Sequence, residues 1–319
     1  MAGRLSEITA ARLAVMAGAA GYGGITVGGR WLSDRGFSLY EISLTGVVFT
    51  ALALLPALLM TPRLRLRRSE LGLFAIFGFV GATLQLTQFA GIVLGVPVAL
   101  VALLLYTQPV WTVLLGRIWL EEPITGRKVG AAALAAVGVL VLFDPRGAAG
   151  TAPTIGLLAA LAAGLALSFW VILARSSALR GNPAVTTTFG YTAFSAVWLL
   201  AAWPLATLVL PSASLGRVSV APFLAQWHWV ALYTVGANLL PALLAMWGMR
   251  RVDASTAGVL LLLEPVSAAL LAWPLFGETL EGNVAVGGGL ILAANWILLR
   301  RKRGGDGPGI RGSQTASAS

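Results

Sequence analysis

The sequence predicts an all-α integral membrane protein in which ten transmembrane helices form two inverted five-helix repeats. Three observations lead to this prediction: the composition, the spacing of long apolar segments, and an internal repeat. Of the 319 residues, 58% are hydrophobic and only 11% are charged, whereas a soluble domain carries about 25% charged residues. The chain has no cysteine and a single histidine, which excludes disulfides, thiolate chemistry and a histidine-rich metal site.

Ten apolar segments are long enough to cross a membrane, because a spanning helix needs about 20 residues to cross a hydrocarbon core of about 30 Å. In chain order they are Ala10–Gly29, Tyr40–Met60, Leu71–Leu94, Val96–Trp119, Gly126–Phe143, Thr154–Ala174, Ala184–Leu205, Trp229–Gly248, Ser255–Phe276 and Gly282–Leu299. A signal peptide is the alternative for the Gly-rich first segment, but nine further spans favour a helix of the bundle. The polar residues 304–319 are expected to form a disordered C-terminal tail.

The distribution of Lys and Arg predicts the orientation. With the N-terminus in the cytoplasm and alternating spans, 18 of the 22 Lys and Arg residues fall on the cytoplasmic side. Cytoplasmic loops of membrane proteins carry this excess. Both termini are therefore expected in the cytoplasm. A protein embedded in the lipid bilayer with this excess of Lys and Arg in its cytoplasmic loops accounts for the net charge of +10. No nucleic-acid partner is therefore expected.

The chain repeats itself at a shift of 156 positions. Residues 96–126 then align on residues 252–282 without a gap, so that Gln108-Pro109 lies on Glu264-Pro265 and Glu122 lies on Glu278. Residues 1–147 and 148–303 are expected to be the two repeats. Because each holds five spans, the halves must have opposite orientations, which is a transporter architecture with the substrate site between the halves.

The segments "TQPVWTVLLGRIWLEEPITGRKVGAAALAAVGV" and "LLEPVSAALLAWPLFGETLEGNVAVGGGLILA" resemble the EamA family of the drug/metabolite transporter superfamily. The stretch "QWHWVALYTVGANLLPALLAMWGMRRVDAST" is similar to the eighth helix of threonine/homoserine exporters, and aromatic amino-acid exporters share the design. The chain departs from the family pattern at Tyr22-Gly23, where Trp-Gly is frequent, and at "EISLTGVVF", where an Arg is frequent. The resemblance covers nearly all of the membrane part.

This resemblance implies a secondary transporter in a bacterial cytoplasmic membrane that exports small organic metabolites, with amino acids as the leading class, by alternating access. It implies no cofactor and no metal, and the sequence lacks the GxxxxGK[ST] nucleotide-binding motif. The alternatives are a broad-specificity drug or other metabolite carrier and a passive channel. An intramembrane enzyme is disfavoured, because one histidine, no cysteine and one carboxylate within a span offer little catalytic chemistry.

Glu264 stands about midway along the ninth segment. A carboxylate at this depth costs roughly 2.5–3.5 kcal/mol, so it is expected to face other helices or water. Three functional interpretations are open: it binds the ammonium group of an amino acid, it carries a coupling proton, or it gates the path. The alternative is structural, a Glu that packs helices around the bend at Pro265.

The other candidates lie close to this level of the membrane. Pro109 and Pro265 are candidate hinges, because proline removes a backbone hydrogen bond and bends its helix. The pairs Gln108-Pro109 and Glu264-Pro265 are predicted to face each other across one central cavity. Glu122 and Glu278 are expected to complement the starts of the fifth and tenth helices. The candidate substrate-binding residues are Tyr22, Gln85, Gln88, Tyr106, Gln108, Ser168, Trp170 and Glu264.

Overall fold

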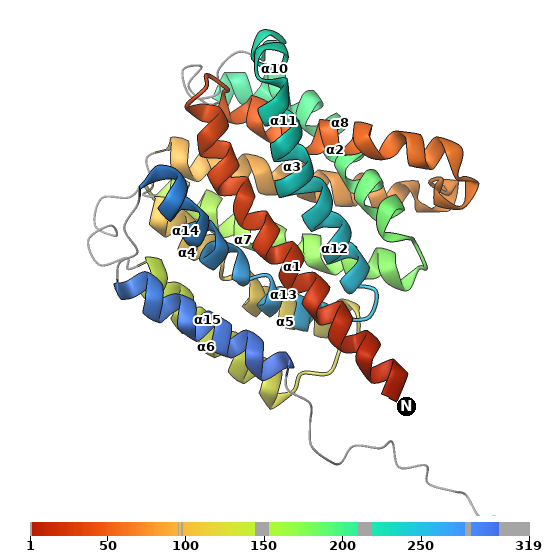
Figure 1. Ribbon diagram of the computed structural model, residues 1–319, viewed down its shortest axis with the longest axis vertical. Helices are drawn as coiled ribbons and strands as arrows, with labels where there is room; N and C mark the ends of the chain where they lie inside the picture. The colour runs from red at the N-terminus through yellow and green to blue at the C-terminus, as the bar shows by residue number, and fades with distance from the viewer. Residues whose placement is uncertain are drawn as a thin grey trace, which may run out of the picture.

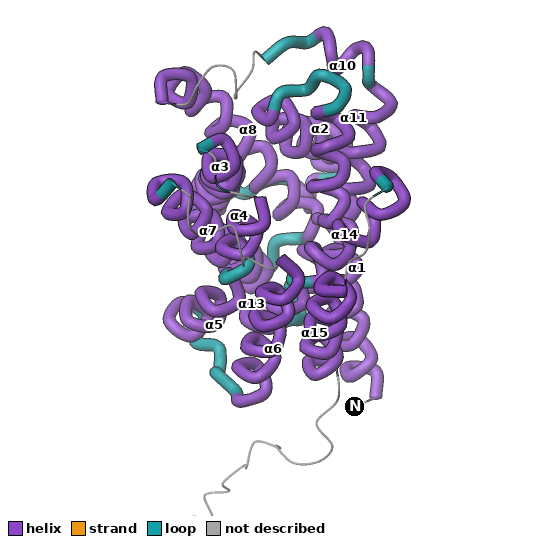
Figure 2. Tube along the Cα trace, turned by 90° about the vertical axis from the view of Figure 1, so that its left-hand side faces the viewer, coloured by secondary structure: helices purple, strands orange, loops and turns teal. Residues whose placement is uncertain are grey.

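The computed structural model describes residues 2–94, 96, 98–143, 153–209, 218–277 and 282–299, and across these residues it contains helices and loops but no strand (Figure 2). The predicted tail at 304–319 and Glu278 lie outside the described residues. The α-helices are α1 (Ala2–Ser33), α2 (Leu39–Met60), α3 (Leu71–Val93), α4 (Val98–Leu105), α5 (Gln108–Trp119), α6 (Gly126–Phe143), α7 (Thr154–Leu179), α8 (Ala184–Val209), α10 (Ala221–Ala225), α11 (Trp227–Tyr233), α12 (Leu240–Gly248), α13 (Ala254–Leu260), α14 (Leu263–Phe276) and α15 (Gly282–Leu299).

The predicted all-α membrane fold with ten spans is confirmed. Ten helical segments of the described chain are long and apolar enough to cross a membrane, and they overlap the ten predicted spans. The protein is a multi-pass membrane protein. The first helix is longer than predicted, since α1 begins at Ala2 and ends at Ser33. It packs along α12 and α14 (Figure 1), as a helix of the bundle does.

Three predicted spans are interrupted rather than continuous. The fourth breaks at Tyr106–Thr107 between α4 and α5, and the ninth breaks at Leu261–Leu262 between α13 and α14. Each break precedes a proline, because Pro109 and Pro265 have no N–H to continue the ladder. The eighth span contains a π-helical turn, η3 (Thr234–Leu239), between α11 and α12. The freed carbonyl of Tyr233 accepts a hydrogen bond from the side chain of Asn238 at 3.1 Å.

The packing of the two halves is reciprocal. The first helix of each half, α1 or α7, packs against the third helix of the other half, which is α12 for α1 and α3 for α7. Each first helix also packs against the interrupted helix of the other half: α1 against α14, and α7 against α4 and α5. The second helices, α2 and α8, contact each other, and so do the fifth helices, α6 and α15. This reciprocal pattern is the one expected for two inverted halves, and the inversion itself stays a prediction.

The pair α6 and α15 shows the reciprocity residue by residue. Near the start of α6, Arg127 donates to the carbonyls of Ile297 and Leu298 at the end of α15, at 2.8 and 2.6 Å. Near the start of α15, Asn283 donates to the carbonyl of Leu142 at the end of α6, at 3.1 Å. Arg127 and Asn283 are 156 positions apart. The two helices therefore run antiparallel and cap each other (Figure 1).

Contacts between loops define two ends of the bundle. At one end, which we call the basic end, the 61–70, 120–125, 180–183 and 249–253 loops lie near the start of α1. Arg67–Asn182 at 3.1 Å joins the 61–70 and 180–183 loops. Lys128 at the start of α6 contacts Asp253 at 2.9 Å, and Arg251 contacts Glu7 of α1 at 3.4 Å. At the opposite end, Glu41 accepts from the backbone of Ser219 at 2.7 Å, and Trp31 packs on Trp229. Loops pair in this way at two opposite ends when successive spans alternate in direction.

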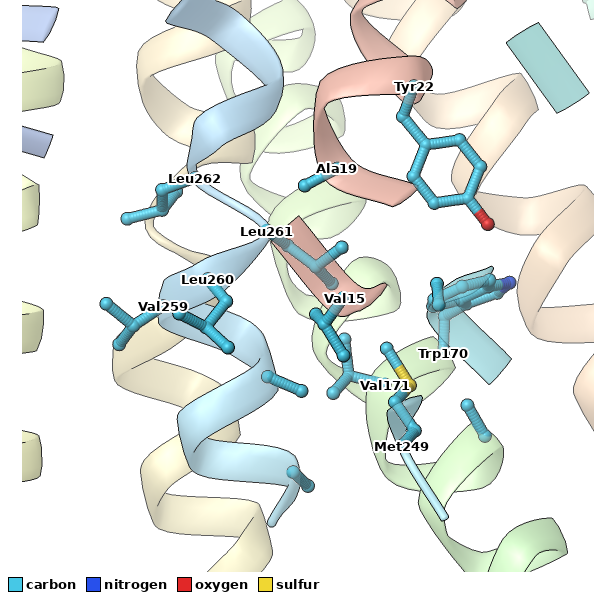
Figure 3. Close-up of a cluster of buried hydrophobic side chains, with 14 of the residues drawn as sticks. Val15, Ala19, Tyr22, Trp170, Val171, Met249, Val259, Leu260, Leu261 and Leu262 are labelled. Atoms are coloured by element: carbon cyan, nitrogen blue, oxygen red, sulfur yellow. The ribbon is translucent and has the colours of Figure 1, made fainter. Parts of the chain in front are cut away.

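The largest apolar cluster fills the space between the halves on the basic side of the breaks. Val15 and Ala19 of α1, Val171 of α7 and Met249 lie in one buried cluster with Leu260 of α13 (Figure 3). Every residue of α13 is buried. In α14, only Pro265, Val266 and Ala272 are buried. The ninth span is thus fully buried before its break, in α13, and largely accessible at its surface after the break, in α14.

Candidate functional site

The two helix breaks meet through one pair of side chains. Tyr106 occupies the break between α4 and α5, and Glu264 lies in the first turn of α14, directly after the second break. The hydroxyl of Tyr106 and the carboxylate of Glu264 are electrostatic neighbours across the two breaks. Tyr106 is buried, whereas Glu264 is half-buried and keeps accessible surface. An acidic side chain of the second half therefore lies beside the break of the first half.

Hydroxyl groups from neighbouring helices and turns bind the carbonyls around the breaks. Thr107 donates to the carbonyl of Leu104 at 2.7 Å, and Ser168 of α7 donates to the carbonyl of Gln108 at 2.9 Å. Ser267 donates to the carbonyl of Glu264 at 2.8 Å. An unsatisfied backbone group in a membrane interior costs several kcal/mol. These bonds allow two irregular backbone segments to exist at membrane depth.

Two glycines allow the neighbouring helix to approach each break. On α1, a Cβ at Gly23 would lie 2.6 Å from the backbone nitrogen of Ala268 and 2.9 Å from the carbonyl oxygen of Glu264. On α7, a Cβ at Gly164 would lie 2.6 Å from the carbonyl oxygen of Leu104. These distances are too short for any side chain at either position. The first helix of each half therefore touches the interrupted helix of the other half along its backbone.

An aromatic cluster adjoins the pair. Tyr22 of α1 packs edge-on to Trp170 of α7 with ring centroids 6.3 Å apart, and lies over it in Figure 3. Trp170 also contacts Phe77 of α3 and Tyr191 of α8, at 5.8 and 5.6 Å. Tyr22 has both Tyr191 and Glu264 as electrostatic neighbours. The cluster thus takes one ring from each of four helices, two in each half, and Tyr22 connects it to Glu264.

Gln108 has different neighbours from Glu264, although the repeat makes the two positions equivalent. Gln108 is fully buried; its amide donates to Thr112 at 2.6 Å, and a Cβ on Gly258 would lie 2.6 Å from its nitrogen. Gly258 belongs to α13, six residues before Glu264 and therefore about 9 Å along the helix. Gln108 is packed between helices on the basic side of the breaks. That the two pairs line one cavity stays a prediction.

The remaining predicted residues divide into two groups. Ser168 and Trp170 lie at the breaks and in the aromatic cluster, as described above. Gln85 and Gln88 are half-buried on α3, eight and eleven residues beyond Phe77, or about 12 and 16 Å along the axis. The contacts that join Tyr106, Glu264 and Tyr22 do not involve them. Among the described residues, no three His, Asp or Glu side chains gather as a metal site requires.

Sequence reasoning missed two features of the site. It did not select Tyr191 or Phe77, because single aromatic residues in apolar spans carry no signal of their position. It did not select Gly23 and Gly164, because glycine is frequent in this chain. Their only sequence signal is that each lies in the first helix of its half, the helix that touches the other half's break.

A bundle of ten spanning helices, with two interrupted helices that meet at a half-buried carboxylate, defines the class of membrane transporters. The EamA-like transporter family matches residues 9–144 and 154–300, once in each half. The chain belongs to this family. It is 27% identical over 270 residues to an uncharacterized transporter of Archaeoglobus fulgidus, covering 85% of this chain and 90% of that protein.

Two further comparisons agree with this assignment. An uncharacterized transporter of Clostridium kluyveri is 21% identical over 273 residues, covering 82% of this chain and 84% of that protein. A crystal structure with 24% sequence identity covers 90% of this chain and 95% of that chain, with a TM-score of 0.68. At this identity the likeness establishes the fold, which the helix packing described above also displays.

Proposed function

We propose that this protein is a carrier that exports small amphipathic solutes, with amino acids as the leading class, by alternating access. The observation that carries the proposal is the meeting of the two helix breaks at Tyr106 and Glu264. Transporters built from repeated halves place their substrate at discontinuous helices between the halves. A half-buried carboxylate beside four aromatic rings suits a ligand with an amine and an apolar side chain.

The charges assign a role to each part of an amino acid. The carboxylate of Glu264 would pair with the ammonium group or exchange a proton for it. The starts of α5 and α14 at the breaks would attract the carboxylate, because a helix start favours negative charge. Tyr22 and Trp170 would contact the side chain. Because Gly23 and Gly164 have no side chains that interlock with the facing helices, the halves would be able to move against each other at these contacts.

The orientation follows from the loops. The basic end would face the cytoplasm, because loops on the cytoplasmic side carry the excess of Lys and Arg. Both termini would then be cytoplasmic, and the two halves would be inverted repeats with boundaries near residues 147 and 303. A reporter fused within the loop between α8 and α10 and one fused at the C-terminus should lie on opposite sides; the same side for both would contradict the ten-span topology.

The function is tested by counterflow in proteoliposomes. Vesicles loaded with one unlabelled amino acid at a time, from the set of twenty, are diluted into trace labelled amino acid. A carrier accumulates the label transiently for its own substrates, because outward flux of unlabelled substrate drives inward exchange. A passive channel only equilibrates the label. Accumulation with no amino acid but with other amines would replace amino acids by a broader substrate class, and no accumulation with any solute would refute a carrier.

A further inference from the structure

The buried carboxylate of Glu122 ties the two halves together at the basic end. It lies in the loop that follows α5 and is 8% exposed. One carboxylate oxygen accepts from the backbone N–H of Ala254 at 2.6 Å. The other accepts from the N–H of Ser255 at 3.1 Å and from the Ser255 hydroxyl at 2.6 Å. The sequence had suggested that Glu122 complements the helix that follows it, but it binds α13 of the other half instead.

The chain is shaped to present this carboxylate. Glu121 has φ of 54°, the only positive φ outside glycine among the described residues, and a left-handed conformation is strained for a residue with a Cβ. The turn brings the N–H of Glu122 to the carbonyl of Gly116 at 3.0 Å. A Cβ on Gly116 would lie 3.2 Å from the Glu122 carboxylate, so this glycine gives it room. Strain of this kind persists where surrounding contacts hold it.

A neighbouring ion pair makes a second tie across the same gap. Lys128 of α6 is 7% exposed, and its ammonium group lies 2.9 Å from Asp253, the residue before α13. It lies 4.0 Å from Glu122 and donates to the carbonyl of Pro123 at 3.1 Å. The first half therefore holds the start of α13 by two charged side chains that are nearly withdrawn from solvent.

The element held in this way is the basic-side part of Glu264's own helix. α13 packs against α5, α6 and α7 and against α1 and α15, whereas α14 packs mainly against α1 and α15. On the other side of the breaks, α4 packs against α7, α6 and α3. The interrupted helices α5 and α13 thus meet at the basic end, while α4 and α14 pack mainly on other partners. The basic end is the closed end of this conformation.

We propose that Glu122 is the latch of the basic end, which holds the path to Glu264 closed by binding α13. The proposal rests on alternating access, because a carrier must open this end once in each cycle. Opening separates α5 from α13, so the three hydrogen bonds of Glu122 break and water takes their place. Opening would also relieve the backbone strain at Glu121. This relief offsets part of the free energy that is lost with the three hydrogen bonds of Glu122. Glu122 then sets how often the basic end opens.

The test uses the absence of cysteine in the chain. A single cysteine at Ala257, a fully buried position of α13, reports whether the basic end is open. Purified full-length protein is treated with a hydrophilic maleimide. We expect Ala257→Cys to react slowly in the parent and about tenfold faster with Glu122→Ala, because charge-assisted hydrogen bonds of this kind are among the strong ones. Ser255→Ala removes one donor of three, and a smaller increase is expected.

Two controls separate a latch from general loosening. A cysteine at Ala294, equally buried on α15, which packs mainly on α6, should react at the same rate with and without Glu122. Asn283→Ala breaks a helix cap at the opposite end and should leave labelling at Ala257 unchanged. The side chain of Glu121 is exposed, and Glu121→Gly relieves the strain at its positive φ. Labelling at Ala257 should then slow by about threefold, which is opposite to the effect of Glu122→Ala.

Unchanged labelling of Ala257 in Glu122→Ala would overturn the latch, and so would a parallel rise at Ala294, which would show that Glu122 only holds the fold. Neither result depends on transport, since labelling is measured without substrate. A protein that fails in counterflow but opens on loss of Glu122 would instead contradict the proposed function and leave the latch standing.

Discussion

The two interrupted helices have the same sequence plan and different surroundings. Both break just before a proline, and a first helix from the other half approaches each break through a glycine. At the α4–α5 break, however, the side chain before the proline is Gln108, fully buried and bonded to Thr112 within its own helix. At the α13–α14 break it is Glu264, half-buried and an electrostatic neighbour of Tyr106 of the other half. The two interrupted helices therefore share a break and a proline but differ in the side chain that precedes the proline.

This difference explains why the repeat alone predicts the site only in part. The shift of 156 positions locates two equivalent points but cannot tell which side chain faces the interior space and which packs between helices. That depends on the turn at each break. The breaks fall at Tyr106–Thr107 and Leu261–Leu262, which differ by one position under the shift, and one residue turns a helix by about 100°.

The largest effect is expected at Glu264. Glu264→Gln keeps the size and a hydrogen-bonding group but removes the charge and the exchangeable proton. We expect counterflow to fall by at least about 100-fold, and any residual transport to lose its dependence on pH. Initial rates between pH 5 and 8, on protein that elutes as a single species, measure both. Residual transport that keeps the parent's pH profile would instead make Glu264 a packing residue.

The glycines at the breaks come next. Gly23→Ala places a methyl group against the backbone of α14, and the backbone cannot yield as a side chain end does, so we expect a loss of about 1–3 kcal/mol in stability. Gly164→Ala should cost a similar amount at the other break. Thermal unfolding in detergent measures the change. Gly289→Ala is the matched control, since a Cβ there meets nothing within 4 Å and should raise the melting temperature slightly or leave it unchanged.

A smaller effect is expected at Tyr106. Tyr106→Phe removes the hydroxyl that neighbours Glu264 but preserves the ring, which stacks on Phe143 with centroids 6.1 Å apart. We expect the apparent affinity for substrate to weaken about tenfold, as the loss of a hydroxyl that can donate a hydrogen bond to a charged group implies, with little change in unfolding temperature. If the variant binds substrate as tightly as the parent, the hydroxyl plays no part in presenting Glu264.

The smallest effect on transport is expected at Gln108. Gln108→Ala leaves a small void and removes the bond to Thr112, so its cost should appear in stability, at about 2 kcal/mol. Counterflow of the folded protein should stay within about threefold of the parent, because the side chain faces α13. A loss comparable to that of Glu264→Gln would place Gln108 in the substrate site, as the sequence interpretation held.

The fold was predictable because a membrane imposes few solutions. Spans of about 20 apolar residues and the asymmetry of Arg and Lys determine the helix count and the alternation of the loops. The breaks were predictable only as bends, since Pro109 and Pro265 mark them but do not reveal that the helix ends. The cross-half contacts of Glu122 and Gly23 were not predictable, because they depend on which surfaces of the two halves meet.

The central claim is that the carboxylate works only at the second break. Its most direct test is counterflow in the exchanged variant, Gln108→Glu with Glu264→Gln, which holds the same two side chains at exchanged positions. Counterflow is measured as a function of pH, and Glu264→Gln alone is measured beside it. Because position 108 is packed between helices, we predict that the exchanged variant transports no better than Glu264→Gln and shows no recovered pH dependence. Recovery of pH-dependent transport toward the parent's rate would show that the two breaks are interchangeable, and would contradict the account.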